Sequence, residues 1–136
     1  MGAKIFGEGS DRIEIEGVNS LKPCDYSVMA DRIEIGTYLT AVTMTKGNVS
    51  IKCSLPSVLE TILDKLKLAG ANIETNDEEI NLEMDKIPNP VNITTAPFPL
   101  FPTDMQAQFI ALNSISNGKS KVIENVFENR FMHVQE

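Results

Sequence analysis

The stretch that decides the fold is TAPFPLFPTDMQAQF, residues 95–109, because it combines a stiff loop with the start of a helix. Its three prolines fix the backbone φ angle and restrict the residues before them, so the loop has little conformational freedom. Thr103, followed three residues later by Gln106, is typical of a capping box, in which both side chains bond backbone N–H groups at a helix start. We therefore predict an extended loop that leads directly into a helix.

The residues on either side of this stretch extend the pattern into a strand–helix–strand unit. The apolar residues that we expect to form the buried face of the helix are Met105, Phe109 and Leu112. The helix should end before Gly118. Strands are predicted over 91–95, before the proline-rich loop, and over 121–126, after the helix.

Two further helices are predicted nearer the N-terminus. Asp31 and Glu34 have the spacing of a capping box, and the helix that they begin should stop near Gly47. Pro56 suits the first turn of the next helix, and Gly70 lies where a left-handed cap is expected. The apolar residues at helical spacing are Ile35, Leu39 and Val42 in the first helix, and Val58, Leu59, Ile62, Leu66 and Ala69 in the second.

Alternating apolar and polar residues predict the remaining strands. They span 11–18, 48–53, 71–75 and 79–83, and the first should be half-buried. The pentapeptide Asp-Arg-Ile-Glu-Ile occurs at both 11 and 31, and we expect a strand in the first copy and a helix in the second, because the downstream context differs. The order of helices and strands favours an α/β domain with helices packed on mixed sheets.

Composition narrows the classes of function. The chain has 136 residues, 12 Lys and Arg against 19 Asp and Glu, and a formal net charge of −7. Such an acidic chain is a poor candidate for non-specific binding of nucleic acid, which depends on cations that neutralise phosphates. No apolar run approaches the roughly 18 residues of a membrane span. With two cysteines and no signal peptide at its start, we expect a cytoplasmic protein with free thiols.

Two longer motifs give a more specific indication. Residues 95–109 together with ENVFENRFMH, residues 124–133, resemble the UDP-N-acetylglucosamine enolpyruvyl transferases (1-carboxyvinyltransferases) of the EPSP synthase-like family. Three shorter segments, starting at Gly2, Asp11 and Ala30, match the same family in the same order. The resemblance implies the inside-out α/β barrel fold, in which each of two similar domains contains three βαβαββ units.

The same resemblance implies a function. Members of this family transfer the enolpyruvyl group of phosphoenolpyruvate to the 3-hydroxyl of UDP-N-acetylglucosamine, which is the first committed step of peptidoglycan synthesis and the target of fosfomycin. The implied partners are therefore phosphoenolpyruvate and UDP-N-acetylglucosamine, and no cofactor is implied.

The resemblance also implies a division of the chain and an interior position within a longer enzyme. Residues 1–28 would close the first domain, and residues 29–136 would form part of the second. The matched region is roughly a third of a family member. It lacks the loop with the reactive cysteine, the Lys-Asn pair that meets phosphoenolpyruvate and a further phosphate-binding arginine, so we expect this piece alone to be inactive.

Four residues are carried over from the family as site residues. Asp104 would bind the sugar 3-hydroxyl and take its proton, although on spacing alone it would be an ordinary acidic residue in a first helical turn. Val126 would contact the UDP-sugar through its main chain, with its side chain in the core. Phe127 would border the substrate cleft, or else be a core aromatic. Arg130 would handle the phosphate-bearing ligand, or else be a surface cation.

The remaining reactive residue types are given no role. Cys24 follows a proline in a turn and Cys53 ends a strand, so neither has the small-residue loop around the family's reactive cysteine. His133 is the only histidine, and a lone histidine makes no metal site. No metal site is predicted.

Two other interpretations stay open. One is the related shikimate-pathway enolpyruvyl transferase, although the FPTDMQ and ENRFMH segments favour the UDP-sugar enzyme. The other is a stand-alone, non-catalytic binding or structural domain of the same fold. The encoding DNA separates an enzyme fragment from a stand-alone domain: a reading frame that continues on both sides indicates the enzyme, whereas a natural stop after Glu136 contradicts it.

Overall fold

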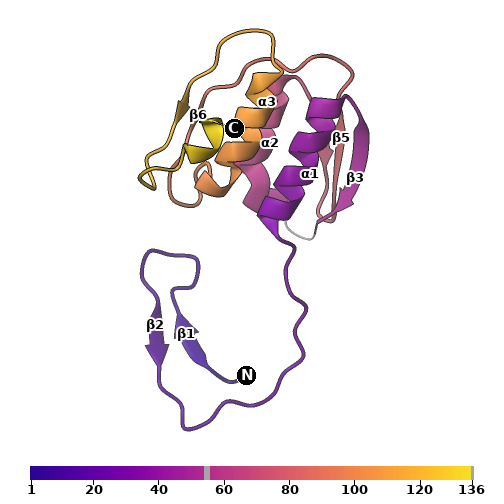
Figure 1. The fold of residues 1–136 in the computed structure, drawn as a ribbon. Coiled ribbons are helices and arrows are strands. Elements are labelled where there is room, and N and C mark those ends of the chain that lie inside the picture. Colours follow the sequence, from indigo (N-terminus) through magenta and orange to yellow (C-terminus); the bar gives the residue numbers. More distant parts are fainter. Residues whose placement is uncertain (54–55, 136) are drawn as a thin grey trace.

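The computed structural model describes residues 1–53 and 56–135. Figure 1 shows a body of helices and strands, formed by the chain from α1 (Arg32–Thr45) onward, and an N-terminal hairpin that lies apart from it at the end of an extended segment. Every residue from 1 to 31 is exposed. All of the buried residues therefore belong to the body.

In its described residues, the body contains two small sheets and three α-helices. The first part comprises α1 (Arg32–Thr45), β3 (Asn48–Lys52), the 3₁₀ helix η1 (Pro56–Leu59), α2 (Glu60–Ala69), β4 (Asn72–Thr75) and β5 (Glu79–Glu83). The second part comprises β6 (Ile93–Thr94), the 3₁₀ helix η2 (Thr103–Met105), α3 (Gln106–Ser114), β7 (Val122–Ile123) and the 3₁₀ helix η3 (Met132–Gln135). The first sheet is antiparallel in the order β3-β5-β4, whereas β6 and β7 pair in parallel.

Apart from an additional strand at the N-terminus, the predicted order of helices and strands is confirmed, and the alternation of the two marks an α/β architecture. The two strands that flank α3 are shorter than predicted, with two residues each. The pentapeptide at 11 contributes to a strand, and its copy at 31 begins a helix, as expected from the context.

The N-terminal hairpin differs from the prediction in two ways. An additional strand, β1 (Lys4–Phe6), pairs antiparallel with β2 (Glu14–Glu16), so the predicted strand over 11–18 is shorter and has a partner that the pattern did not indicate. The prediction of half-burial is wrong, since Ile13 and Ile15 are 59% and 68% exposed. Alternation alone cannot bury one face, because burial also needs a second layer to pack on that face.

The caps of α1 and α2 follow local sequence signals. The Asp31 side chain accepts hydrogen bonds from the N–H groups of Ile33 and Glu34, at 2.7 and 3.3 Å. Gly70 ends α2 with a φ of 106°, in the left-handed region that favours glycine. At the end of α1 this role falls to Lys46, one residue before the expected glycine, with a φ of 57°.

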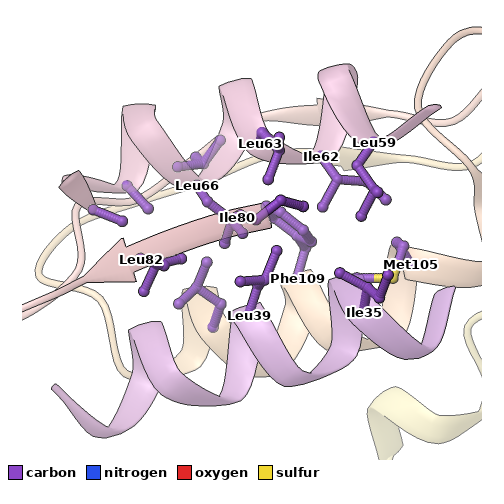
Figure 2. Packing of buried hydrophobic residues seen from close by; sticks show 14 of the residues in the cluster. Ile35, Leu39, Leu59, Ile62, Leu63, Leu66, Ile80, Leu82, Met105 and Phe109 are labelled. Carbon is purple, nitrogen blue, oxygen red and sulfur yellow. The ribbon is translucent and has the colours of Figure 1, made fainter. Parts of the chain in front are cut away.

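The core lies where the three helices meet β5. Figure 2 shows the side chains of α1, α2 and α3 converging on Ile80 and Leu82 of that strand. Most of the predicted apolar residues are buried, with Val42 and Val58 only half-buried. Those that are fully buried are Leu39, Leu59, Ile62, Leu66, Ala69, Met105, Phe109 and Leu112. Phe109 also meets Phe101 of the proline-rich loop edge to face, with ring centroids 5.0 Å apart. The loop is therefore anchored to α3 by aromatic packing.

A close approach of α1 to Met105, the last residue of η2, helps to position the segment that carries Asp104. A Cβ atom placed on Gly36 would lie 3.0 Å from both Sδ and Cε of Met105, so the missing side chain is what allows this contact. The side chain of Gln108 on α3 donates to the Thr37 hydroxyl of α1, at 2.9 Å. These contacts fix the first turn of the η2–α3 segment against α1.

The exposure of α2 residues predicts a sharp difference between two identical substitutions. Leu66 is fully buried, whereas Leu68, on the same helix, is 62% exposed. We expect Leu66→Ala to lower the free energy of unfolding by about 2–5 kcal/mol, because a buried leucine leaves a cavity, and Leu68→Ala to change it by about 0.5 kcal/mol or less. Urea unfolding followed by circular dichroism measures both. Equal losses in the two variants would contradict this arrangement of α2.

Candidate active site

Asp104 lies in the middle of η2, directly after the proline-rich loop. Its neighbours on the loop side, Phe101 and Pro102, are buried, and Met105 on its other side is fully buried. The Asp104 side chain itself is 55% exposed. The carboxylate is thus held at the surface by a backbone whose adjacent residues are fixed in the core.

The predicted capping box at this helix start is wrong. Neither Thr103 nor Gln106 bonds a backbone N–H group there, and no side chain caps η2 or α3. Both side chains instead donate to one oxygen of Glu124, with distances to Oε2 of 2.8 Å from Thr103 and 3.1 Å from Gln106. A distant carboxylate has replaced the local partners, which the spacing of the two residues cannot reveal.

Glu124 also accepts hydrogen bonds on its other oxygen. Oε1 lies 2.8 Å from the Thr95 hydroxyl, 2.9 Å from the N–H of Val126 and 3.2 Å from the N–H of Phe127. The Thr95 hydroxyl in turn accepts a hydrogen bond from the N–H of Asn125, at 3.0 Å. One carboxylate therefore joins the end of β6, the start of η2 and the loop after β7.

These hydrogen bonds determine the protonation state of Glu124. Burial raises the pKa of its carboxyl, but hydrogen bonds from the hydroxyls of Thr103 and Thr95 and from the N–H groups of Val126 and Phe127 lower the pKa more, to about 2. Hydrogen bonds of this kind favour the charged form because every donor points at the ionised oxygens. Glu124 is consequently ionised at neutral pH.

The loop after β7 brings Arg130 to Asp104. Its Nη2 lies 2.9 Å from Asp104 Oδ1, and its guanidinium carbon lies 5.2 Å from the centre of the Phe127 ring. The Arg130 side chain is 38% exposed. The two long sequence motifs, which are separated along the chain, thus meet through a charged pair that is open to solvent.

Val126 and Phe127 occupy the same loop with different surroundings. Phe127 is 55% exposed, so its interpretation as a core aromatic is wrong and it lies at the surface beneath Arg130. Val126 is half-buried, and its N–H is bonded to Glu124. The N–H of Val126 is therefore engaged within the protein.

The remaining reactive residue types lie elsewhere. Cys24 is exposed and Cys53 is buried, and both are free thiols. In the described part of the chain, no three or more His, Cys, Asp or Glu side chains are grouped so that they could hold a metal ion. None of the helices described between residues 1 and 135 is long and apolar enough to cross a membrane.

Comparison with known proteins identifies the family of this chain. The chain belongs to the EPSP synthase family, described as EPSP synthase (3-phosphoshikimate 1-carboxyvinyltransferase), which matches residues 1–136. Its structure is similar to that of the enolpyruvyl transferase NikO from Streptomyces tendae, with a TM-score of 0.81 and 24% sequence identity. The match covers 98% of this chain and 33% of that one. The predicted enolpyruvyl transferase fold is confirmed.

Glu124 is the residue of this site that the sequence analysis missed. Two of its donors are local, because Glu124 accepts from the N–H groups two and three residues later, as the side chain of a helix N-cap does. The other donors come from 18, 21 and 29 residues away, and no spacing rule connects them to Glu124. Only the fold reveals that the residue links several segments.

The lowered pKa of Glu124 predicts a specific loss of stability in acid. Because the folded-state pKa is about 2, against an ordinary value of 4.5, the ionised carboxylate stabilises the fold fully above pH 4.5 and loses this effect as the pH falls toward 2. Thermal melting between about pH 6 and pH 2.5 should therefore show a smaller acid-induced fall in Tm for Glu124→Gln than for the wild type.

Glu128→Gln is the matched control, because Glu128 is an exposed residue of the same loop. It removes the same charge without removing the hydrogen bonds to Glu124, so its acid profile should follow that of the wild type. Parallel profiles for the wild type and Glu124→Gln would contradict the role given to this carboxylate.

Proposed function

We propose that this chain forms part of an enzyme that transfers the enolpyruvyl group of phosphoenolpyruvate to the 3-hydroxyl of UDP-N-acetylglucosamine, in peptidoglycan synthesis in the cytoplasm. The observation that carries the proposal is the 2.9 Å pair between Asp104 and Arg130. It brings together the two motifs whose sequences favour the UDP-sugar enzyme. Membership of the EPSP synthase family supports the type of reaction.

In this proposal Asp104 is the general base. It takes the proton of the sugar hydroxyl while that oxygen forms a bond to C2 of phosphoenolpyruvate, and the transfer ends with release of phosphate. A base must lie within hydrogen-bond reach of the proton that it removes, which requires an exposed and firmly mounted carboxylate. Asp104 meets both conditions, and among the described residues only Oδ1 of its two oxygens has a hydrogen-bond partner.

Arg130, Val126 and Phe127 would bind substrate around this base. The guanidinium of Arg130 suits a phosphate-bearing ligand because its planar set of donors can form two parallel hydrogen bonds. The carbonyl group of Val126 would accept from the UDP-sugar, and the exposed Phe127 ring would form one border of the cleft. Residues 1–28 would close the first domain of the enzyme, and residues 29–136 would belong to the second.

The remaining cations for the two anionic substrates would come from other parts of the enzyme. The chain spans 33% of the length of NikO and carries a net charge of −7, with 12 basic residues in total. Two phosphorylated substrates need a more positive surrounding than this chain offers, since anion binding depends on Lys, Arg and backbone donors. We therefore expect the isolated chain to be inactive.

A second candidate is the transfer of the same group to shikimate 3-phosphate, which the description of the matching family favours. Supplying the enzyme that contains this chain with phosphoenolpyruvate and either acceptor, and measuring the phosphate released, separates the two functions. Turnover with shikimate 3-phosphate but not with UDP-N-acetylglucosamine would overturn the first proposal. Absence of turnover with both would favour a non-catalytic domain of the same fold.

The role of Asp104 predicts a large loss of activity from a nearly isosteric change. In the enzyme that contains this chain, Asp104→Asn should lower kcat by at least about 100-fold, because general base catalysis typically contributes about 10² to 10⁴ in rate. Steady-state phosphate release measures this, with melting curves to check the fold. Asp85→Asn, at another exposed position, is the control and should leave kcat unchanged. Near-native turnover of Asp104→Asn would sink the assignment.

The isolated chain should bind the nucleotide sugar weakly or not at all. Isothermal titration with UDP-N-acetylglucosamine should give a Kd no tighter than about 1 mM, because most of the proposed cationic contacts are absent from this chain. A titration with UDP alone distinguishes binding of the sugar from binding of the diphosphate. Micromolar affinity of the isolated chain would contradict the proposed division of the site.

A further inference from the structure

We propose that Glu124 is a positioning residue of this site, whose carboxylate fixes the loop that carries Val126, Phe127 and Arg130 against the segment that carries Asp104. The inference rests on the proposed function. It assigns no contact between Glu124 and substrate, and it concerns only how the binding groups are held in register.

The distribution of donors over the two oxygens supports this role. Oε1 takes the two backbone N–H groups of the loop, from Val126 and Phe127, at 2.9 and 3.2 Å. Oε2 takes the hydroxyl of Thr103, which directly precedes Asp104, at 2.8 Å, and the amide of Gln106 at 3.1 Å. A single rigid group thus has one oxygen on each of the two segments that must stay together.

The burial of two of its donors makes the hydrogen bonds of Glu124 harder to replace. Gln106 is 1% exposed and Thr95, the fifth donor, is fully buried, so these partners cannot turn to bulk water without leaving the core. Removing the acceptor would leave buried donors without a partner, which costs more than an exposed hydrogen bond contributes. The loop should consequently lose its fixed position when Glu124 is shortened.

The positions of the loop residues show what that displacement would disturb. Phe127 has its backbone bonded to Glu124 and its ring beneath the guanidinium of Arg130, which itself pairs with Asp104. A shift of the loop therefore moves Arg130 relative to Asp104, although neither is among the described hydrogen-bond partners of Glu124. Displacements of about 1 Å in a catalytic arrangement can lower the rate by roughly 100-fold.

The test uses the enzyme that contains this chain, three test variants and one control variant. Glu124→Ala removes both acceptor oxygens. Glu124→Gln keeps one oxygen, which can face the loop N–H groups, and so serves as the conservative variant. Thr103→Val removes one donor to Oε2 and leaves the bonds to the loop in place. Glu128→Gln is the matched control on the same loop.

Hydrogen exchange measured on the peptide that covers residues 124–130 tests the connection itself. We expect exchange of this peptide to be fastest in Glu124→Ala, intermediate in Glu124→Gln and close to the wild type in Thr103→Val and Glu128→Gln. This measurement does not depend on the reaction that the enzyme catalyses. Unchanged exchange in Glu124→Ala would overturn the proposal whatever the activity is.

Kinetics test the consequence for catalysis. Glu124→Ala should lower kcat/KM by about 100-fold through both a higher KM for the acceptor and a lower kcat, with partial recovery in Glu124→Gln. Asp104→Asn, in contrast, should lower mainly kcat. Faster exchange of the loop with unchanged kinetics would overturn the positioning role while the proposed function stands. Unchanged kinetics in Asp104→Asn would instead overturn the function of the site.

Where Glu124→Ala does not fold, the comparison of Glu124→Gln with Glu128→Gln decides the question. Both variants remove one negative charge from the same loop, so only the difference in hydrogen bonding separates them. The proposal requires a raised KM for the acceptor and faster loop exchange in Glu124→Gln alone. Equal behaviour of these two variants would overturn it.

Discussion

The structure of the candidate site depends on one ionised carboxylate that accepts hydrogen bonds from five donors. Burying a charge is costly unless it is well solvated by the protein, and the donors around Glu124 supply that solvation without a counter-ion. Because the donors come from β6, η2, α3 and the loop after β7, the requirement to satisfy one charge holds four segments together. The short parallel pair of β6 and β7, with two residues each, provides few backbone bonds to do the same.

The pair of Asp104 and Arg130 differs in character from the half-buried carboxylate of Glu124. Asp104 and Arg130 are both substantially exposed, and exposed pairs contribute only about 0–1 kcal/mol to stability. Such a pair can be rearranged by a ligand at little cost, while the backbone beneath it stays fixed by Met105, Phe101 and Glu124. The site thus combines a fixed backbone with a charged pair that can rearrange. A site needs both if its arginine must pair with a carboxylate in one state and with a phosphate in another.

The sequence predicted those parts of the fold whose causes are local. Asp31 caps the helix that follows it, Gly70 takes the left-handed cap, and the apolar spacing around Leu66 identifies the buried face of α2. Thr103 and Gln106 had an equally clear local signal, and it was wrong because Glu124 competes for both side chains from 21 and 18 residues away. For Asp104 and Arg130 the motifs named the residues, but neither spacing nor composition could show that the two side chains meet.

The arrangement around Glu124 also explains how an acidic chain could serve anionic substrates. If this carboxylate were neutralised by an arginine, the site would lose a cation to a structural task. Its charge is instead stabilised by neutral hydroxyl, amide and backbone donors, and among the described residues no Lys, Arg or His forms a salt bridge with it. Arg130 instead pairs with the exposed Asp104, and in the proposed function a phosphate-bearing ligand would replace Asp104 as its partner. The net charge of −7 describes the whole chain, whereas binding depends on which charges are already satisfied within the fold.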